Sequence, residues 1–171
     1  MTIRRRSVSM PGMDDLDRRI VRLLERHGRL SQEELARRIR LSRPAVHQRV
    51  KRLEAARVIR GYRAELDWAA LGLPLTAFVW VRTGGPNCAP VGPAILDLGD
   101  DGALVEEAHR VTGEWCLLVK ARTATPLALQ DLIDRIRAVP GVANTTTTLA
   151  LSSLRHQDVA DGDPTVPEPA G

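Results

Sequence analysis

Residues 31–63 of the chain read SQEELARRIRLSRPAVHQRVKRLEAARVIRGYR. Ser31 and Glu34 have the spacing of a capping box, which predicts that a helix begins directly after Ser31. The helical pattern then breaks, and Ser42 offers a second N-cap, so a short turn is expected to join two helices. Two short helices joined in this way are typical of a helix-turn-helix, a motif that presents its second helix to DNA.

The second of these helices is expected to bury one side and expose the other. Val46, Val50 and Leu53 follow the spacing of a single helical face and are predicted to point inward. Pro44 lies in the first turn, where its missing N–H costs least. The outward side is rich in hydrogen-bond donors. We predict that it contacts DNA through Ser42, Arg43, His47, Gln48, Lys51 and Arg52.

The chemistry of these side chains suggests separate roles on DNA. Arg43, Lys51 and Arg52 suit phosphates or the edges of guanines. Gln48 can pair with adenine through two hydrogen bonds, and His47 can donate to a base edge or a phosphate. We therefore expect Gln48 and His47 to carry sequence specificity. The alternative is that the same residues form an ordinary solvated helix face, and the role of Arg49 stays open between packing and pairing.

The segments on either side complete the expected DNA-binding unit. Residues 57–63 are rich in β-formers, with Gly61 at a bend, and are predicted to form the wing of a winged helix-turn-helix. Residues 14–26 carry a helical stripe of apolar side chains, which predicts a first helix packed behind the other two.

Charge supports a nucleic-acid partner for the first part of the chain. Residues 1–60 contain 17 Arg and Lys against 7 Asp and Glu, a net charge of +10. Residues 61–171 contain 8 against 14, a net charge of −6. Neutralising phosphates is the main source of non-specific affinity for DNA, so we expect a polyanion to bind the first part only. A length of 171 residues with 43% hydrophobic residues suits two small domains.

Several classes of protein and site are not expected. No segment approaches the roughly 18 to 20 apolar residues of a membrane-spanning helix, and the first residues, MTIRRRSVSMPGM, have no apolar core of a signal peptide. We therefore expect a cytoplasmic protein without a membrane partner. Cys88 and Cys116 are too few and too far apart in sequence for a disulfide framework or a zinc site, and are predicted to be reduced thiols. The four histidines show no metal-ligand spacing, so neither a metal nor a cofactor is predicted.

The second half of the chain predicts a small sheet with two helices. Gly113 and Glu114 separate two β-compatible segments, which is a hairpin signal. The expected order is strand, helix, strand, strand, helix, strand, the ferredoxin-like arrangement, in an α+β protein. The predicted elements are strand 76–82, helix 91–98, strands 103–112 and 115–122, helix 127–136 and strand 142–151.

The chain resembles the Lrp/AsnC family of leucine-responsive, or feast/famine, transcription regulators. The resemblance rests on LDRRIVRLLERHGRLSQEELARRIRLSRPAVHQRVKRLE, VIRGYRAELDWAALGL, VEEAHRVTGEW and PGVANTTTTLAL, in the order and spacing of the family, over residues 14–155. It implies a homodimer formed through the C-terminal sheets, often assembled further into tetramers or octamers. A two-fold dimer would place two recognition helices about 34 Å apart, which predicts a pseudo-palindromic operator in double-stranded DNA.

The resemblance also divides the chain into functional parts. It implies that an amino acid or related metabolite binds between C-terminal domains. The expected parts are a disordered basic arm (1–13), a winged helix-turn-helix DNA-binding domain (14–62), a connector (63–74), a ferredoxin-like effector-binding and oligomerisation domain (75–155) and a disordered tail (156–171).

The family binds its effector near a hairpin turn of the form Gly-Asp-Tyr-Asp and a threonine on the last strand. The matching residues here are Gly113, Glu114, Trp115, Cys116 and Thr147, with Thr145 on the same strand face. Cys116 replaces the second acid, and a thiol is a weak partner for an α-ammonium group. Glu114 serving in its place, a different effector and an unused pocket are the alternatives. A further departure is Arg57, which stands where the family has a glycine after the recognition helix, at a cost of about 1 kcal/mol.

Three functions are compatible with this sequence. The first is a sequence-specific transcription regulator, and the second is an architectural protein that wraps DNA with little base discrimination. The third is an enzyme, since some haem-pathway decarboxylases resemble this family in both domains. His109 is the one candidate acid or base near the expected effector turn, and a lone histidine is more often structural. We therefore expect a regulator and not an enzyme.

Overall fold

A computed structural model of the chain describes residues 12–85 and 88–152. The chain divides into two compact units between Glu65 and Leu66, inside the connector expected at 63–74, and the two units are described separately. Residues 1–11 of the expected arm and the whole of the expected tail, 156–171, lie outside the described residues. Met13, assigned to the arm, packs against the core of the first unit.

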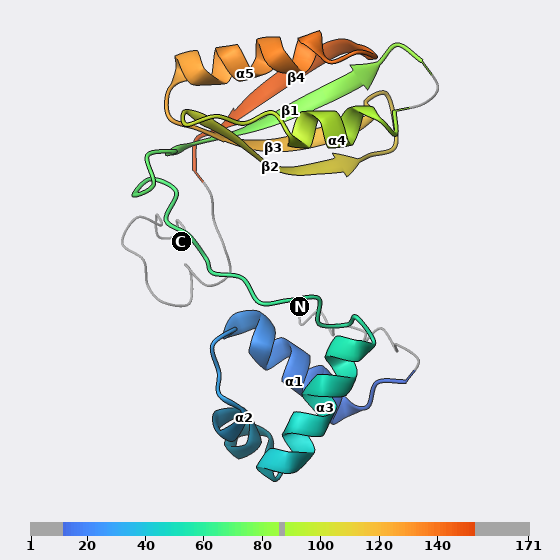
Figure 1. Ribbon diagram of the computed structural model, residues 1–171, viewed down its shortest axis with the longest axis vertical. Coiled ribbons are helices and arrows are strands. Elements are labelled where there is room, and N and C mark those ends of the chain that lie inside the picture. The colour runs from blue at the N-terminus through green and yellow to red at the C-terminus, as the bar shows by residue number, and fades with distance from the viewer. Residues whose placement is uncertain (1–11, 86–87, 153–171) are drawn as a thin grey trace, which may run out of the picture. The chain divides into compact units, whose positions relative to one another are not determined.

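The first unit contains three helices, α1 (Asp15–Arg26), α2 (Gln32–Ile39) and α3 (Arg43–Ala55) (Figure 1). Ser31 and Glu34 form the predicted capping box in both directions, and the Ser42 side chain accepts a hydrogen bond from the Ala45 N–H at 3.4 Å. These caps satisfy backbone N–H groups that have no partner inside the helices. The helix-turn-helix is therefore formed by α2 and α3, as the sequence predicts.

The core of this unit is built from one side of each helix. Ile20 is fully buried in α1, and the inward positions predicted for α3 are buried as well. Partly buried side chains from α1 and from the segments that flank the helices pack against them. Because the core fixes the rotation of α3 about its own axis, it also decides which side chains face outward. The buried core residues are Ile20, Leu35, Ala36, Ile39, Val46, Val50 and Leu53.

The strand expected for the wing at 57–63 is not formed, and these residues have irregular backbone. The helix α3 ends in a Schellman turn, in which the Val58 N–H donates to the Leu53 carbonyl at 2.9 Å and Arg57 has φ +54°. A strand needs a neighbour to supply ladder hydrogen bonds. Within the described residues no strand of this chain precedes Leu75, so the β-prone composition of 57–63 has nothing to pair with.

The second unit has the predicted βαββαβ order. Its four strands form one antiparallel sheet in the order β2-β3-β1-β4, so the first and third strands of the chain lie at its centre (Figure 1). The hairpin between β2 and β3 is present, with a longer loop than predicted. The elements are β1 (Leu75–Thr83), α4 (Val91–Leu96), β2 (Ala103–Arg110), β3 (Leu117–Thr123), α5 (Pro126–Ala138) and β4 (Val142–Ala150).

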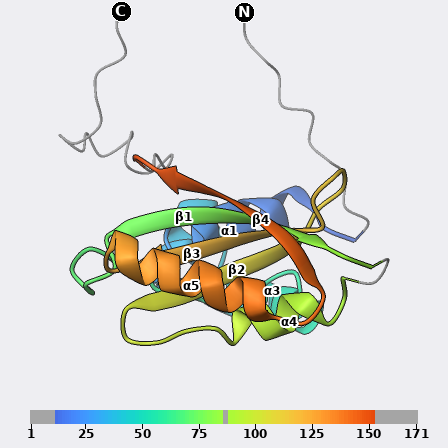
Figure 2. The same ribbon diagram turned by 90° about the horizontal axis from the view of Figure 1, so that it is seen from above.

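Both helices of this unit cover the same face of the sheet (Figure 2). Ile95 of α4 and Leu132 of α5 share one core with alternate strand residues such as Val79 and Val119. On the opposite, open face the strands carry Phe78, Trp80 and Leu118, which are only half-buried. We call these three residues the open-face cluster. No helix in the described part of the chain is long and apolar enough to span a membrane.

One end of the open face is closed by a charged cluster that the sequence did not reveal. Arg122 of β3 is only 6% exposed. Its guanidinium donates to the Thr76 hydroxyl at 2.6 Å and to the Glu106 carboxylate at 2.8 Å. The ring of Trp68, from the turn before β1, lies 5.3 Å from the guanidinium carbon. The connector therefore folds back onto the sheet at this end.

Candidate nucleic-acid interface and effector site

The outward side of α3 carries the residues predicted to contact DNA. Ser42, Arg43, His47, Gln48, Lys51 and Arg52 are all exposed. They lie on the side of the helix opposite Val46, Val50 and Leu53, which are buried in the core. The surface they form is dominated by hydrogen-bond donors and positive charge, which is the chemistry that phosphates and base edges require.

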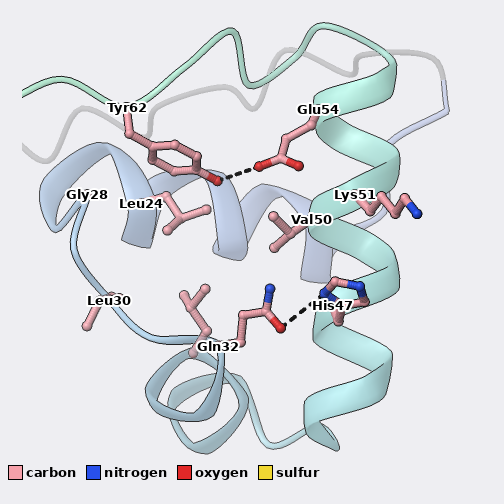
Figure 3. Close-up of a pocket in the computed structure, with 10 residues that line it drawn as sticks. Leu24, Gly28, Leu30, Gln32, His47, Val50, Lys51, Glu54 and Tyr62 are labelled. Carbon is pink, nitrogen blue, oxygen red and sulfur yellow. Dashed lines mark hydrogen bonds between the residues drawn. The ribbon is translucent and has the colours of Figure 1, made fainter.

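Within this surface, His47 is already positioned by a neighbour. Its Nδ1 lies 3.1 Å from the side-chain oxygen of Gln32, the first residue of α2 (Figure 3). With that oxygen accepting, Nδ1 carries the hydrogen, and Nε2 of the neutral ring is an acceptor. A neutral His47 therefore offers DNA an acceptor, and it donates from Nε2 only when protonated.

Arg52 differs from the other five because it is part of an internal ion pair. Its Nη2 lies 2.6 Å from the carboxylate of Asp17 in α1, a residue that is only 1% exposed. Arg49, whose role the sequence left open, lies 2.8 Å from the other Asp17 oxygen and 2.6 Å from Asp14. The two arginines therefore fasten α3 to the start of α1, and Arg52 reaches DNA only with donors that Asp17 does not engage.

A pocket of about 430 Å³ lies beside the recognition surface, between α3 and the other two helices (Figure 3). His47 and Lys51 line it together with Tyr62, whose hydroxyl donates to Glu54 at 2.9 Å. Burial, with a smaller effect of Glu54, raises the pKa of Tyr62 to about 12, so the phenol stays a neutral donor. No sequence motif predicted this pocket, because its lining comes from three helices and the segment after α3.

The predicted effector turn connects β2 to β3 and is organised by a residue of β1. Gly113 has φ +107°, a conformation that other residues rarely adopt. Arg82 places Nη1 3.2 Å from the Glu114 carboxylate, and its guanidinium carbon lies 5.9 Å from the centre of the Trp115 ring. Sequence reasoning missed Arg82, although a single charge in the apolar strand TAFVWVR was a usable signal.

Cys116 is the last residue of this turn and contacts β1. Its N–H donates to the Val81 carbonyl at 2.9 Å, and its sulfur lies 3.2 Å from the Thr83 hydroxyl. Hydrogen bonds from the Thr83 side chain, and then from its backbone, lower the pKa of the Cys116 thiol. The position where the family has an acid is therefore occupied by a thiol in a polar setting that favours its anion.

The two predicted threonines lie on the other side of β1 from the turn. Thr145 pairs with Val81 and Thr147 with Val79, so the two side chains share one face of the strand, as predicted, and this is the helix-covered face. Thr145 is buried, and its hydroxyl accepts a hydrogen bond from Arg137 of α5 at 2.9 Å. Within one chain, the turn and Thr145 therefore lie at the same end of the sheet, but β1 separates them.

His109, the residue considered for an enzymatic role, is exposed on the edge strand β2. Its Nε2 lies 2.7 Å from the Glu107 carboxylate of the same strand. Both side chains are exposed to solvent. The pair therefore does not form a site from which water is excluded.

Both units match known families of domains. A model described as winged helix-turn-helix DNA-binding matches residues 13–60, and a model described as Lrp/AsnC ligand binding domain matches residues 76–159. The chain is 38% identical to the HTH-type transcriptional regulator LrpA of Mycobacterium tuberculosis over 142 residues, which cover 83% of this chain and 92% of that protein. It is 35% identical to the leucine-responsive regulatory protein of Rhizobium meliloti over 144 residues, 84% of this chain and 92% of that one.

Two solved structures with a bound amino acid resemble the whole described fold. The feast or famine regulatory protein of Mycobacterium tuberculosis complexed with L-methionine has a TM-score of 0.76 at 36% identity, over 83% of this chain and 94% of that one. A transcriptional regulator of Neisseria meningitidis in complex with L-methionine has a TM-score of 0.75 at 26% identity, over 84% and 93%.

Proposed function

The chain is a member of the Lrp/AsnC family of transcription regulators, and we propose that it binds a pseudo-palindromic operator as a homodimer whose affinity for DNA changes when an amino acid or related small metabolite binds. The observation that carries this proposal is the outward side of α3. It exposes a set of donors on a helix that core packing and the Asp17 ion pairs hold in one orientation. A rigid helix with a donor-rich face is suited to reading the major groove.

Within that surface we assign different roles to different residues. Gln48 and His47 read bases, since their side chains offer directional hydrogen bonds. Arg43 and Lys51 bind phosphates and set the register of the protein on DNA. Arg52 contributes mainly by fixing α3 against Asp17, with its exposed part adding positive charge near the phosphates.

The effector site is proposed at the turn from Gly113 to Cys116. Two similar proteins bind L-methionine, which supports an α-amino acid here as well. Glu114 is the carboxylate available in the turn for the ammonium group, and Arg82 is the cation beside it for the carboxylate. Because β1 separates the turn from Thr145 and Thr147 within one chain, we propose that a second chain completes the site.

Self-association through the open face of the sheet follows from the open-face cluster of Phe78, Trp80 and Leu118. These apolar side chains lie half-exposed on a face that no helix covers. A second copy of the chain can bury them around a two-fold axis. We therefore propose a homodimer, which can assemble further, and we propose no catalytic role for the exposed pair of His109 and Glu107.

The test is a fluorescence-anisotropy titration of the full chain against the DNA upstream of its own gene and against a scrambled duplex. It is run at two salt concentrations, with and without L-methionine and then with other amino acids. Tight binding to the upstream DNA alone, with an affinity that shifts when an amino acid is added, is the expected result. Equal and steeply salt-dependent binding to both duplexes would favour the architectural function instead, since phosphate contacts would then dominate.

A further inference from the structure

Gln32, the first residue of α2, is joined to His47 of α3 by a side-chain hydrogen bond. The Gln32 amide oxygen lies 3.1 Å from Nδ1 of the His47 ring (Figure 3). The capping box of Ser31 and Glu34 fixes the start of α2 and therefore the place from which the Gln32 side chain extends. The core shared by α2 and α3 fixes the spacing of the two helices. The contact is therefore built into the helix-turn-helix.

This contact determines which nitrogen of the His47 ring carries the hydrogen. An amide oxygen can only accept, so Nδ1 of His47 supplies the hydrogen of the bond. A neutral imidazole has one N–H, which leaves Nε2 as an acceptor with a free lone pair. Nε2 lies on the side of the ring away from Gln32 (Figure 3). Because His47 is exposed, this acceptor is available to a ligand.

His47 stands in the middle of a stripe of positive charge on α3. Arg43 lies one turn before it and Lys51 one turn after it, and all three side chains are exposed. Residues four apart lie on the same side of a helix. In a major groove about 12 Å wide, the outer cations can reach phosphates while the side chain between them meets base edges. The position of His47 therefore suits a base contact better than a phosphate contact.

An acceptor at this position distinguishes two classes of base. In the major groove adenine and cytosine present an amino group, whereas guanine and thymine present a carbonyl oxygen. The amino group can donate to Nε2. A carbonyl oxygen would instead face the lone pair of Nε2, and both acceptors would be left without a hydrogen bond. A histidine that carried its hydrogen on Nε2 would have the opposite preference.

We propose that Gln32 is a positioning residue that holds the hydrogen of His47 on Nδ1, so that the neutral ring selects an adenine or a cytosine on the contacted strand and rejects guanine and thymine there. The position of the hydrogen rests on the contact with Gln32. The base preference rests on the proposed function of α3 as a helix that reads DNA.

Nitrogen NMR of the ¹⁵N-labelled full chain, without DNA, tests the position of the hydrogen. The spectra are recorded at about pH 8, where an ordinary histidine side chain is neutral. The chain has 4 histidines, so the His47 signals are identified by their absence in His47→Asn. We expect the Nδ1–H form in the wild type and in Gln32→Glu, whose carboxylate can only accept. Gln32→Leu should lose this preference. An Nε2–H form in the wild type, or an unchanged form in Gln32→Leu, would overturn the role of Gln32.

The base preference is measured as ratios of Kd values on duplexes of the upstream DNA that differ at one base pair. The position read by His47 is the one at which His47→Ala loses discrimination. There the wild type should bind adenine or cytosine about three- to tenfold more tightly than guanine or thymine, the range expected of a single hydrogen bond. If no position depends on His47, or if guanine or thymine is preferred there, the proposal is overturned.

Variants of Gln32 connect this preference to the contact. Gln32→Leu should lose the preference at the His47 position, and Gln32→Glu should keep it although the added negative charge weakens binding to every duplex. Gln48→Ala is the control, because it should change discrimination at another position and leave this one intact. Loss of the preference in Gln32→Glu, or its retention in Gln32→Leu, would contradict positioning by Gln32.

Removing the amino group from the DNA gives the complementary test. Purine in place of adenine, or pyrimidinone in place of cytosine, deletes only the exocyclic amino group. The wild type should lose the same three- to tenfold factor, of about the size of one hydrogen bond, and His47→Ala should lose nothing. Equal losses in both proteins would show that His47 does not contact this group. If the wild type binds upstream and scrambled DNA equally, the proposed function fails, while the NMR result judges the role of Gln32 separately.

Discussion

The carboxylate of Asp17 in α1 forms an ion pair with Nη2 of Arg52 in α3 at 2.6 Å. Asp17 is buried, whereas Arg52 lies on the surface predicted to face DNA. The same carboxylate also binds Arg49 at 2.8 Å. One buried acid thus joins the first helix to the recognition helix through two cations. The orientation of α3, and not only its stability, depends on this arrangement.

Replacing Asp17 by Asn should lower the free energy of unfolding of the first unit by about 2 kcal/mol. Removing one partner leaves the guanidinium groups without their buried counter-charge, and the partial exposure of both arginines limits the loss. Chemical denaturation followed by helical circular dichroism measures this change. Trp68, Trp80 and Trp115 all lie in the second unit, so tryptophan fluorescence should report an unchanged transition.

The matched control for this change is Asp15→Asn in the same helix. Asp15 pairs with Arg18 at 2.9 Å but its side chain is 93% exposed. Exposed ion pairs contribute little to stability. Equal losses for the Asp17 and Asp15 variants would contradict the special role of the buried acid.

Replacing Arg57 by glycine should stabilise the first unit by about 0.5 to 1 kcal/mol, because Arg57 adopts φ +54° at the end of α3 and glycine meets no steric penalty there. The midpoint of thermal unfolding of the helical signal measures the effect. Arg57→Ala also removes the side-chain charge but keeps a Cβ atom, so it should give no such gain. A gain of the same size in the alanine variant would show that charge, and not backbone conformation, is responsible.

The helix-turn-helix should lose stability in acid partly through Glu34. Hydrogen bonds from Ser31, first from its backbone and then from its side chain, hold the pKa of Glu34 below its ordinary 4.5. A carboxyl whose pKa is lowered on folding contributes stability above the unfolded pKa and loses it as pH falls through the folded pKa. Unfolding measured from pH 7 down to the region below 4.5 should therefore show a weaker pH dependence in Glu34→Gln than in the wild type. Identical pH profiles would refute this role.

Local signals in the sequence predicted most of the fold. The capping box of Ser31 and Glu34 acts within four residues, so its outcome depends on little else. The strand expected at 57–63 is not formed, because strand formation depends on a pairing partner and not on composition alone. The contact between Arg122 and Trp68, which close one end of the open face, could not be predicted from periodicity either, because the two residues come from separate segments.

The candidate sites were predictable only where a single helix or turn carries them. The exposed residues of α3 follow from helical spacing, but the pairing of Arg52 with Asp17 needed the packing of α1 on α3. The contact between Arg82 and Glu114 depends on how β1 meets the turn before β3. No spacing rule along the chain encodes such a contact.

Replacing Arg82 by Gln should weaken the response to an amino acid while leaving DNA affinity without effector unchanged. Arg82 binds Glu114 and lies over Trp115, so the variant loses the contacts that order the turn. Tryptophan fluorescence during an L-methionine titration measures binding, and Trp115→Phe identifies the part of the signal that comes from the turn. The proposed effector site would be refuted if Arg82→Gln bound the amino acid as tightly as the wild type.

Sequence readout by α3 is tested most directly by the ratio of Kd values for scrambled and operator DNA in the wild type and in Gln48→Ala. Losing a pair of hydrogen bonds to a base should cost about 1 to 3 kcal/mol on the operator alone, so the ratio should fall roughly 5- to 150-fold. Lys51→Ala should instead weaken binding to both duplexes and reduce the salt dependence by about one phosphate. If Gln48→Ala weakened binding to both duplexes equally, α3 would not be reading bases, and the claim of a sequence-specific regulator would be contradicted.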